Sequence, residues 1–276
     1  MGISPIFSVN MCYNILMPRI TRVSVWNILH HVINYMKYNI QKKYFEEKYK
    51  TKNNIWSIIP TGKEAKNFLR LMKKYKPKGR MVDLGCGNGK FARFFAKNGF
   101  FGYGIDYVLE VIKEAKKLAT EDNIGKRTYF KVGDVLSMDY PTHFFDFAYD
   151  YGCLHHIKKR DWGQYLRNIL RILKKDGFFM LSMFSKNTIK HFGFYPKKSK
   201  QNWVIHKEPE NYLHYDHFFT KEEILNLFSK DFNFINIVEK KLDLNQIFQK
   251  IKPNEKLESI KDSSFPVFFH VQMKRK

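Results

Sequence analysis

Cysteine is scarce in this chain of 276 residues. Its three cysteines, Cys12, Cys86 and Cys153, are too few and too scattered for a disulfide framework or a cysteine-based zinc site. Disulfide-rich secreted domains and zinc-ribbon proteins are therefore excluded, and we expect a reduced, cytoplasmic protein.

Long hydrophobic runs are missing as well. No stretch reaches the roughly 18 apolar residues that a membrane span needs, because two asparagines and two histidines interrupt the nearest one, 23–36. The first acidic residue is Glu46, and an acid-free, mildly basic start can be an organellar presequence. It can equally be a helix packed on the domain, or an extension ahead of a native start at Met17 or Met36. We favour the last two interpretations.

Acidic residues are few beside basic ones. The chain has 26 Asp and Glu against 49 Lys and Arg, a formal net charge of +23. Such an excess can indicate a nucleic-acid or anionic-membrane partner. However, the lysines are spread along the chain, and Phe, Tyr, Ile and Asn, which AT-rich codons supply together with Lys, are also abundant. We interpret the charge as mainly compositional bias and expect any binding of nucleic acid to be non-specific.

From residue 80 onward, short apolar runs alternate with amphipathic helical patterns. Strands are predicted over 80–84, 100–105, 128–132, 144–149, 177–184, 232–239 and 265–273. Helices are predicted near 89–98, 108–120, 160–174 and 220–229. The alternation predicts a Rossmann-like, doubly wound α/β fold with a seven-stranded, mostly parallel sheet. No helix separates the last two strands, so the final strand should be antiparallel.

Two segments lie outside this rhythm. Residues 1–79 are expected to form a helical N-terminal extension, and 80–276 the ligand-binding domain. Residues 185–219 are long and irregular, and they follow the fifth predicted strand. Their position places them at the carboxyl edge of the sheet, where open α/β folds bind ligands, so we expect a substrate lid.

The stretch DLGCGNGK at residues 83–90 lies between a predicted strand and a predicted helix. Gly85, Gly87 and Gly89 let a ligand approach the backbone, and amides at a helix start bind carboxylate or anionic groups. The third glycine comes one residue too early for a dinucleotide loop of the form G-x-G-x-x-G. Asp83 would repel a pyrophosphate but attract a free amino group. The loop therefore favours an amino-acid-bearing nucleoside.

Two further acids end the next predicted strands. Asp106, about 20 residues past the loop, can accept hydrogen bonds from both ribose hydroxyls, and Tyr107 can stack on a base. Asp134, followed by Val135, would face an adenine amino group. Loops at strand ends favour Asp in any case, so each acid alone is weak evidence. Together with the glycine loop, the acids indicate a nucleoside site.

In these motifs the chain resembles the class I S-adenosylmethionine-dependent methyltransferases. DLGCGNG is similar to the family's first motif, YGIDYVLEVIKEAKKLA to its second strand and helix, KVGDVLSMD to its adenine-contacting segment and FFDFAYDYGCLHHI to its fourth strand. GCLHH and the later FFTKEEILNLF also resemble a small-molecule branch related to thiopurine and tellurite-resistance methyltransferases. The resemblance covers roughly residues 80–240. It implies the same sheet and S-adenosylmethionine as cofactor.

The resemblance also implies roles for individual residues. The glycine loop and the acid before it would surround the methionine part of the cofactor, the acid after the second strand would bind the ribose, and the third strand end would bind adenine. The predicted cofactor-binding residues are Asp83, Gly85, Cys86, Gly87, Gly89, Asp106, Tyr107, Asp134, Val135 and Asp150.

The end of the fourth predicted strand would lie at the reacting methyl group. A general base is needed only if the nucleophile arrives protonated. His155 or His156 can be that base or a substrate contact, although one can instead cap a helix and the other pack. Cytosine C5 methyltransferases use the cysteine of a Pro-Cys pair as nucleophile. Here Cys153 follows Gly152 instead, so it does not match that motif. The histidines within 185–219 match no familiar metal spacing, so no metal is predicted.

The sequence thus predicts a methyltransferase that acts on a small-molecule acceptor. A methyltransferase acting on RNA or protein through the basic surface is the first alternative. A non-catalytic regulatory protein that binds S-adenosylmethionine is the second.

Overall fold

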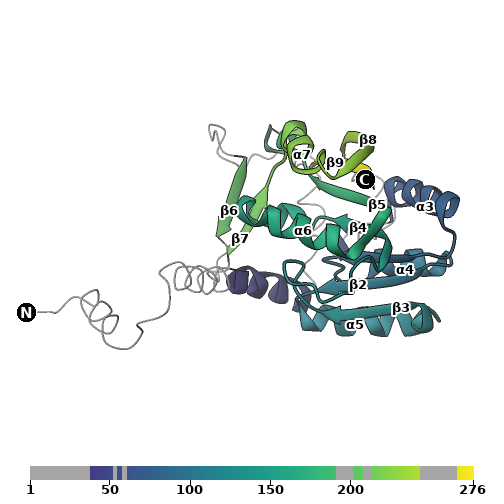
Figure 1. The fold of residues 1–276 in the computed structure, drawn as a ribbon. Helices are drawn as coiled ribbons and strands as arrows, with labels where there is room; N and C mark the ends of the chain where they lie inside the picture. The colour runs from purple at the N-terminus through teal and green to yellow at the C-terminus, as the bar shows by residue number, and fades with distance from the viewer. Residues whose placement is uncertain (1–37, 52–54, 58–60, 191–201, 208–212, 243–265) are drawn as a thin grey trace, which may run out of the picture.

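The computed structural model describes residues 38–51, 55–57, 61–190, 202–207, 213–242 and 266–276 (Figure 1). Seven strands form one sheet in the order β3-β2-β1-β4-β5-β9-β8. Their bounds are β1 Arg80–Leu84, β2 Phe101–Asp106, β3 Thr128–Val132, β4 Phe145–Tyr151, β5 Leu173–Phe184, β8 Phe232–Lys241 and β9 Val267–Arg275.

The strand directions confirm the predicted fold. The pairs β1–β2, β1–β4, β2–β3 and β4–β5 are parallel, whereas β9 pairs antiparallel with both β5 and β8. The last strand of the chain therefore inserts between two earlier strands. This is the Rossmann-like arrangement with an antiparallel final strand.

Helices cover both faces of the sheet (Figure 1). The helices α3 Lys63–Tyr75, α4 Lys90–Lys97 and α5 Leu109–Glu121 pack on one face, and α6 Trp162–Ile172 and α7 Lys221–Phe228 on the other. Within β4, Phe147 and Tyr149 belong to the first core, while Ala148 between them belongs to the second. Successive strand residues point to opposite faces, so both cores need an unbroken apolar run.

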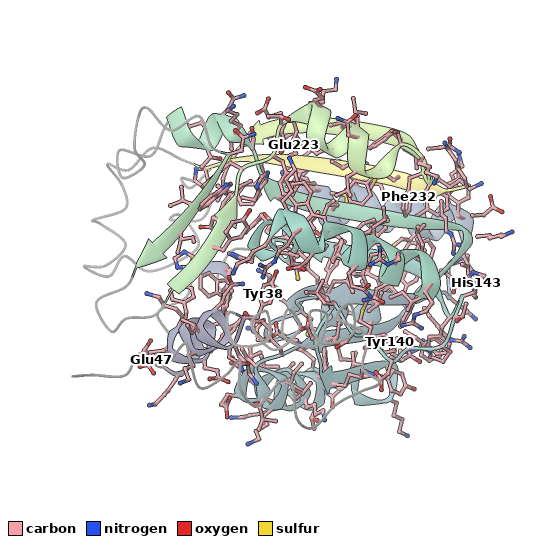
Figure 2. The ribbon with its side chains drawn as sticks, turned by 60° about the vertical axis from the view of Figure 1, so that its left-hand side comes forward. Tyr38, Glu47, Tyr140, His143, Glu223 and Phe232 are labelled. Carbon is pink, nitrogen blue, oxygen red and sulfur yellow. The ribbon has the colours of Figure 1, made fainter. Side chains whose placement is uncertain are left out.

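The start of α7 shows how local sequence fixes a helix end. Thr220 accepts a hydrogen bond from the backbone N–H of Glu223 at 3.1 Å, and the Glu223 carboxylate accepts one from the backbone N–H of Thr220 at 3.1 Å. This reciprocal capping box satisfies two amides that the helix itself leaves without partners. Glu223, labelled in Figure 2, also lies 3.2 Å from Nε2 of His217 and so links α7 to the preceding strand.

Two further elements lie at the carboxyl edge of the parallel strands. Residues 38–50 are helical, and β6 Trp203–Lys207 pairs antiparallel with β7 Leu213–His217 in a separate ribbon. The two touch where Tyr44 stacks on His214 at 4.1 Å. The ribbon corrects our expectation of irregular structure over 185–219, because tertiary contacts of this kind select a strand that its short sequence alone does not specify.

Short helical turns complete the described chain. They are η1 Ile55–Ser57, η2 Gly125–Arg127, η3 Leu154–His156, η4 Lys159–Asp161 and η5 Lys186–Lys190. The expectations for residues 1–37 concern a part of the chain outside the described residues. Within the described part, no helix has both the length and the apolar character needed to cross a membrane.

Candidate active site

The glycine loop between β1 and α4 adopts a backbone that other residues resist. Gly85 and Gly87 have φ angles of +64° and +53°. A Cβ atom on Gly85 would lie 2.9 Å from the Cβ of Cys153, and one on Gly87 would lie 2.7 Å from the hydroxyl oxygen of Tyr49. Both conformation and contact therefore require glycine here, and the loop is pressed between β4's following turn and the N-terminal helical segment.

Asp106 ties this loop to the end of β2. Its Oδ2 accepts a hydrogen bond from Gly87 N at 3.0 Å, and its Oδ1 accepts one from Val108 N at 3.0 Å. Burial raises the pKa of Asp106 to about 6, although these backbone hydrogen bonds partly oppose the shift. The carboxylate keeps unused lone pairs and lines the cavity described below, so it can accept hydrogen bonds from a ligand.

Asp83 and Asp150 are buried beneath the loop. Asp83 accepts a hydrogen bond from Ala92 N at 3.3 Å, and burial raises the pKa of this carboxyl well above its usual range. Asp150 accepts hydrogen bonds from Cys153 N at 2.7 Å and Leu154 N at 3.1 Å, and from a tyrosine hydroxyl of α6. Asp150 thus holds the turn that carries the two histidines, which is a supporting position behind the cavity wall.

A cavity of about 480 Å³ opens beside the glycine loop. One side, here termed the motif wall, comes from the predicted motifs and comprises Gly85, Asp106, Tyr107, Gly133, Asp134 and Val135. The other side, here termed the cover wall, comprises Tyr38, Gln41, Tyr44, Phe45, Tyr49, His214 and Asp216. His155 and His156 lie between the two walls.

The predicted cofactor residues divide into two groups. Those that line the cavity are Gly85, Asp106, Tyr107, Asp134 and Val135, together with both predicted histidines. Those that lie behind its surface are Asp83, Cys86, Gly87, Gly89 and Asp150. Asp134 is the most open of the lining acids, and its Oδ1 accepts a hydrogen bond from Leu136 N at 2.8 Å.

Sequence reasoning missed most of the cover wall. Tyr38, Gln41, Phe45 and Tyr49 follow one another at spacings of three and four residues, which places them on one face of a helix. That spacing was readable, but it is equally typical of a helix that packs on a core. The hydroxyl of Tyr38 donates to Asp161 Oδ2 at 2.8 Å, which fixes this helix against η4.

The segment expected to form a lid supplies one strand of the cover wall. His214 and Asp216 of β7 reach the cavity, whereas His217 packs edge-on against Trp162 and lies 3.2 Å from Glu223. Trp203 packs near Tyr215 and does not line the cavity. Of the other histidines and aromatic residues in this segment, His191 and Tyr212 lie outside the described residues, as does the side chain of His206.

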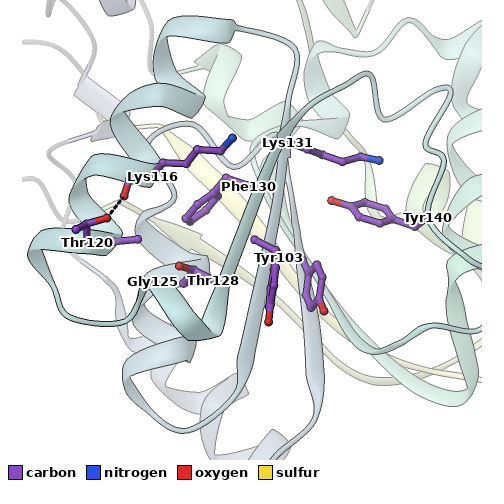
Figure 3. A pocket seen from close by; sticks show the side chains of 10 residues that line it. Tyr103, Lys116, Thr120, Gly125, Thr128, Phe130, Lys131 and Tyr140 are labelled. Carbon is purple, nitrogen blue, oxygen red and sulfur yellow. Dashed lines mark hydrogen bonds between the residues drawn. The ribbon is translucent and has the colours of Figure 1, made fainter.

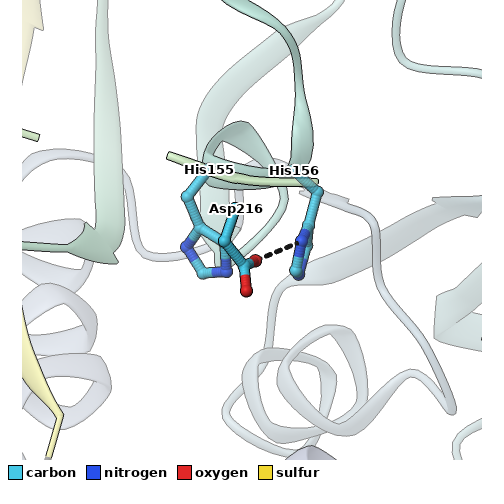
Figure 4. A group of neighbouring side chains, drawn as sticks. All are labelled: His155, His156 and Asp216. Carbon is cyan, nitrogen blue, oxygen red and sulfur yellow. Dashed lines mark ion pairs between the residues drawn. The ribbon is translucent and has the colours of Figure 1, made fainter. Parts of the chain in front are cut away.

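His155, His156 and Asp216 form a compact group, with one nitrogen or oxygen atom of each within 4.8 Å of the others (Figure 4). His156 Nδ1 lies 2.9 Å from Asp216 Oδ1 and 3.1 Å from the carbonyl oxygen of Tyr215. A carbonyl oxygen only accepts hydrogen bonds, so Nδ1 carries a hydrogen and is not available to a metal ion. His156 Nδ1 is thus hydrogen-bonded to the carbonyl oxygen of Tyr215, with the carboxylate of Asp216 at ion-pair distance and His155 beside it.

His155 is held as a neutral side chain. It is buried and stacks on Phe184 at 4.1 Å, and burial lowers its pKa well below the usual value. Its Nδ1 accepts a hydrogen bond from Phe184 N at 3.4 Å. Accordingly, His155 forms part of the cavity surface and keeps His156 in place through an edge contact of 4.3 Å.

A second hollow of about 520 Å³ lies between α5 and the edge strand β3 (Figure 3). It is lined by Tyr103, Lys116, Ala119, Thr120, Gly125, Thr128, Tyr129, Phe130, Lys131 and Tyr140. None of these lining side chains is a histidine, a cysteine or a carboxylate, and none belongs to the predicted site.

Fold and site together define the class I S-adenosylmethionine-dependent methyltransferases. The methyltransferase domain family matches residues 60–239, and the chain belongs to that family. The residues present suit its cofactor: the glycine loop leaves room where a side chain would clash, and Asp106 and Asp134 offer acceptors in a cavity of sufficient size.

Curated relatives and solved structures agree with this assignment. The chain is 30% identical over 106 residues to 27-O-demethylrifamycin SV methyltransferase of Amycolatopsis mediterranei, covering 38% of each chain. It is 27% identical over 169 residues to a tRNA (carboxymethyluridine(34)-5-O)-methyltransferase of Schizosaccharomyces pombe, covering 53% of this chain and 69% of that one. Thus it spans only about two fifths of the first of these relatives.

Among solved structures, Burkholderia thailandensis 1,6-didemethyltoxoflavin-N1-methyltransferase has a similar fold. It aligns with a TM-score of 0.61 at 19% identity, over 88% of this chain and 90% of that one, and it was solved with 1,6-didemethyltoxoflavin and S-adenosylhomocysteine. A methyltransferase from Methanosarcina mazei aligns with a TM-score of 0.58 at 20% identity, over 74% and 96%. At these identities the likeness establishes the fold.

Proposed function

We propose that this protein transfers the methyl group of S-adenosylmethionine to a small, uncharged acceptor. The composition of the cavity lining carries the proposal. The whole chain has 49 Lys and Arg, yet none of the described residues that line the cavity is Lys or Arg. A site for phosphate-bearing substrates would concentrate cations, whereas this one presents aromatic rings, histidines and carboxylates.

The two walls would hold the two reactants. The bound cofactor supplies a methyl group already activated on a sulfonium sulfur. On the motif wall, Asp106 and Asp134 would accept hydrogen bonds from its polar groups, and the glycine loop would admit it close to the backbone. On the cover wall, Tyr38, Tyr44 and Phe45 would enclose an apolar acceptor and exclude water, so that positioning lowers the barrier to transfer.

The names of the relatives support both a small-molecule acceptor and its rivals. They include rifamycin and ajmaline methyltransferases, but also a tRNA methyltransferase and a protein-lysine methyltransferase. The net charge of +23 favours RNA as second candidate. The absence of Lys and Arg among the described lining residues favours the small molecule.

The test is a comparison of acceptor pools. The full chain is incubated with S-adenosylmethionine labelled in the methyl group and with either a small-molecule extract, cellular RNA or a protein extract, at near-physiological salt. We expect label in the small-molecule pool alone. Label at one RNA position, or in one protein, would refute the proposal, and absence of cofactor binding in calorimetry would refute methyl transfer altogether.

A further inference from the structure

His156 presents a basic nitrogen to the cavity. Its Nδ1 lies 3.1 Å from the carbonyl oxygen of Tyr215, which only accepts hydrogen bonds, so the ring hydrogen is on Nδ1; the carboxylate of Asp216 lies 2.9 Å from the same nitrogen at ion-pair distance. The neutral ring then has its lone pair on Nε2. Because Nδ1 is turned toward β7 and the ring lines the cavity, Nε2 is the nitrogen left for a ligand (Figure 4).

Contacts from three segments hold this geometry. Gln41 donates from Nε2 to the carbonyl oxygen of His156 at 3.0 Å and accepts at Oε1 from Tyr215 N at 3.1 Å. It therefore bridges η3 and β7, the two elements that carry His156 and Asp216. From below, Asp150 accepts hydrogen bonds from the first amides of the η3 turn. A base held in this way has a fixed tautomer and a fixed direction, as the orienting carboxylate of a hydrolase triad provides.

The charged or titratable groups near His156 are Asp216 and His214 from β7, His155 from the same turn and Asp150 from the end of β4. The helical segment 38–50 faces the ring with Phe45, at 5.0 Å, which is uncharged.

We infer that His156 is the base that removes a proton from a hydroxyl group of the acceptor, and that Asp216 is the positioning residue that orients it. The inference rests on the proposed function. The hydroxyl proton passes to Nε2 of His156. The oxygen's freed electron pair forms the new O–CH₃ bond, the sulfonium S–CH₃ bond breaks and leaves a neutral thioether, and the imidazolium later releases its proton to water.

The chemistry of the acceptor follows from the need for a base. A neutral amine already has a free lone pair and a carboxylate is already ionised, so neither needs a base to start the reaction. A neutral hydroxyl group does, more than a thiol, whose lower pKa leaves a larger thiolate fraction near neutral pH. The lining adds Tyr151, Phe184 and Phe268 to the aromatic cover wall, and its described residues include no Lys or Arg for an anionic group. The acceptor class is therefore an uncharged alcohol or phenol on an apolar, ring-containing body.

The first test reads the tautomer without any acceptor. The full chain is labelled with ¹⁵N-histidine, and long-range ¹H–¹⁵N correlations assign the His156 nitrogens by their loss in His156→Gln. We expect hydrogen on Nδ1 and a downfield Nδ1–H proton. Asp216→Asn should shift that proton upfield, whereas Asp134→Asn, which removes another carboxylate of the cavity, should leave it in place. A hydrogen on Nε2 in the wild type would overturn the inference.

A second test reads the acceptor atom. With ¹³C-methyl S-adenosylmethionine and a small-molecule extract, the carbon shift of the product distinguishes O–CH₃ from N–CH₃ and S–CH₃. We expect O–CH₃. For that acceptor, Asp216→Asn should lower kcat by about 100-fold while KM and cofactor affinity change little. An N–CH₃ or S–CH₃ product, or an equal loss of cofactor binding in the variant, would overturn the assignment.

A third test asks whether His156 binds a metal ion. Zn²⁺ or Mg²⁺ added to the ¹⁵N-labelled protein should leave the His156 nitrogen signals unchanged, and chelator should have no effect. Stoichiometric shifts reversed by chelator would identify a metal centre in place of the base. If cofactor binds but no pool accepts label, the proposed function fails, while the tautomer measurement still decides the His156–Asp216 pair.

Discussion

The two walls of the cavity differ in how far apart along the chain their contacts lie. On the motif wall, the hydrogen bond from Gly87 to Asp106 joins residues 19 apart. On the cover wall, Gln41 and Tyr215 are 174 apart, and Tyr38 and Asp161 are 123 apart. A wall of the first kind forms from residues of adjacent βα units. A wall of the second kind exists only after the helical segment 38–50 and the β6–β7 ribbon meet over the sheet edge.

This difference suggests a division of labour. A cofactor shared by many enzymes can be bound by a compact, repeating motif, so the motif wall need not change with the acceptor. The cover wall can vary through residues outside the motif without disturbing the sheet. The following experiments test whether the two walls are as separable as this comparison implies.

The largest effect should come from removing the helical segment of the cover wall. A chain beginning at Met36 should stay soluble and bind S-adenosylmethionine, because residues 38–50 remain. A chain beginning at Thr51 loses Phe45 and Tyr49, which pack against Tyr107 and the glycine loop, and should show no binding in calorimetry. Equal binding by both chains would show that the motif wall is sufficient on its own.

The contrast also explains what the sequence could predict. Asp106 and Tyr107 were predicted as cavity residues because strand, loop and helix patterns place them at one sheet edge, and all seven strands follow from local runs. Gln41 and Asp216 were not predicted as cavity residues. They come together only because a helix before the sheet meets a ribbon after its fifth strand, and the sequence around each residue does not show this contact. Asp150 was predicted for the cofactor, yet its oxygens are occupied by backbone amides and Tyr165.

A substitution at the point where the walls touch should have the next largest effect. Gly87→Ala places a Cβ at φ +53° and 2.7 Å from the Tyr49 hydroxyl oxygen. The conformational strain alone costs about 1–2 kcal/mol, so cofactor affinity should fall about tenfold or more. Tyr49→Phe should partly restore binding in the double variant, whereas Gly125→Ala, which meets no neighbour, should be neutral. Additive effects in the cycle would argue against a contact between the walls.

Removing the carboxylate at the end of β2 should weaken cofactor binding through the motif wall alone. Asp106→Ala should reduce affinity for S-adenosylmethionine by about 1–3 kcal/mol, because polar groups of the bound cofactor would lose a buried acceptor in the cavity. Calorimetry measures the change. Circular dichroism should show that Asp106→Ala and the cover wall variant Tyr44→Ala are equally well folded. Of the two, only Asp106→Ala should bind S-adenosylmethionine more weakly than the wild type by about 1–3 kcal/mol.

A fall in pH should stabilise the folded, cofactor-free protein but weaken its binding of S-adenosylmethionine. The pKa of Asp106 is raised to about 6 in the folded protein, so in the absence of cofactor the carboxyl is mostly protonated near pH 5. Protonation relieves the buried charge, and this term favours the folded protein increasingly as pH falls from about 6 toward 4. The ionised form that binds a cationic cofactor is then only about one tenth populated at pH 5.

We therefore expect affinity for S-adenosylmethionine to fall about tenfold between pH 7 and pH 5, with proton release upon binding in the acid range. Calorimetry in buffers of different ionisation enthalpy measures the protons released. Asp106→Asn cannot ionise, so its weaker binding should depend much less on pH. An unchanged pH profile in that variant would assign the titration to another group of the cavity, such as Asp134.

The smallest effect is expected from the basic surface, which belongs to neither wall. A protein of net charge +23 binds RNA at low salt whatever its function, because neutralised phosphates release counterions. Binding of this kind should weaken steeply between about 50 and 200 mM salt and show little preference among sequences or shapes. Specific recognition would instead persist near physiological salt. Filter binding at several salt concentrations and with several RNAs separates the two kinds of binding.

Because the cavity lining contains no described Lys or Arg, excess RNA should leave methylation of a small acceptor unchanged. Competitive inhibition by one RNA at physiological salt would mean that the surface guides a polymer into the cavity, and the cover wall would then have to be reinterpreted as the element that reads it.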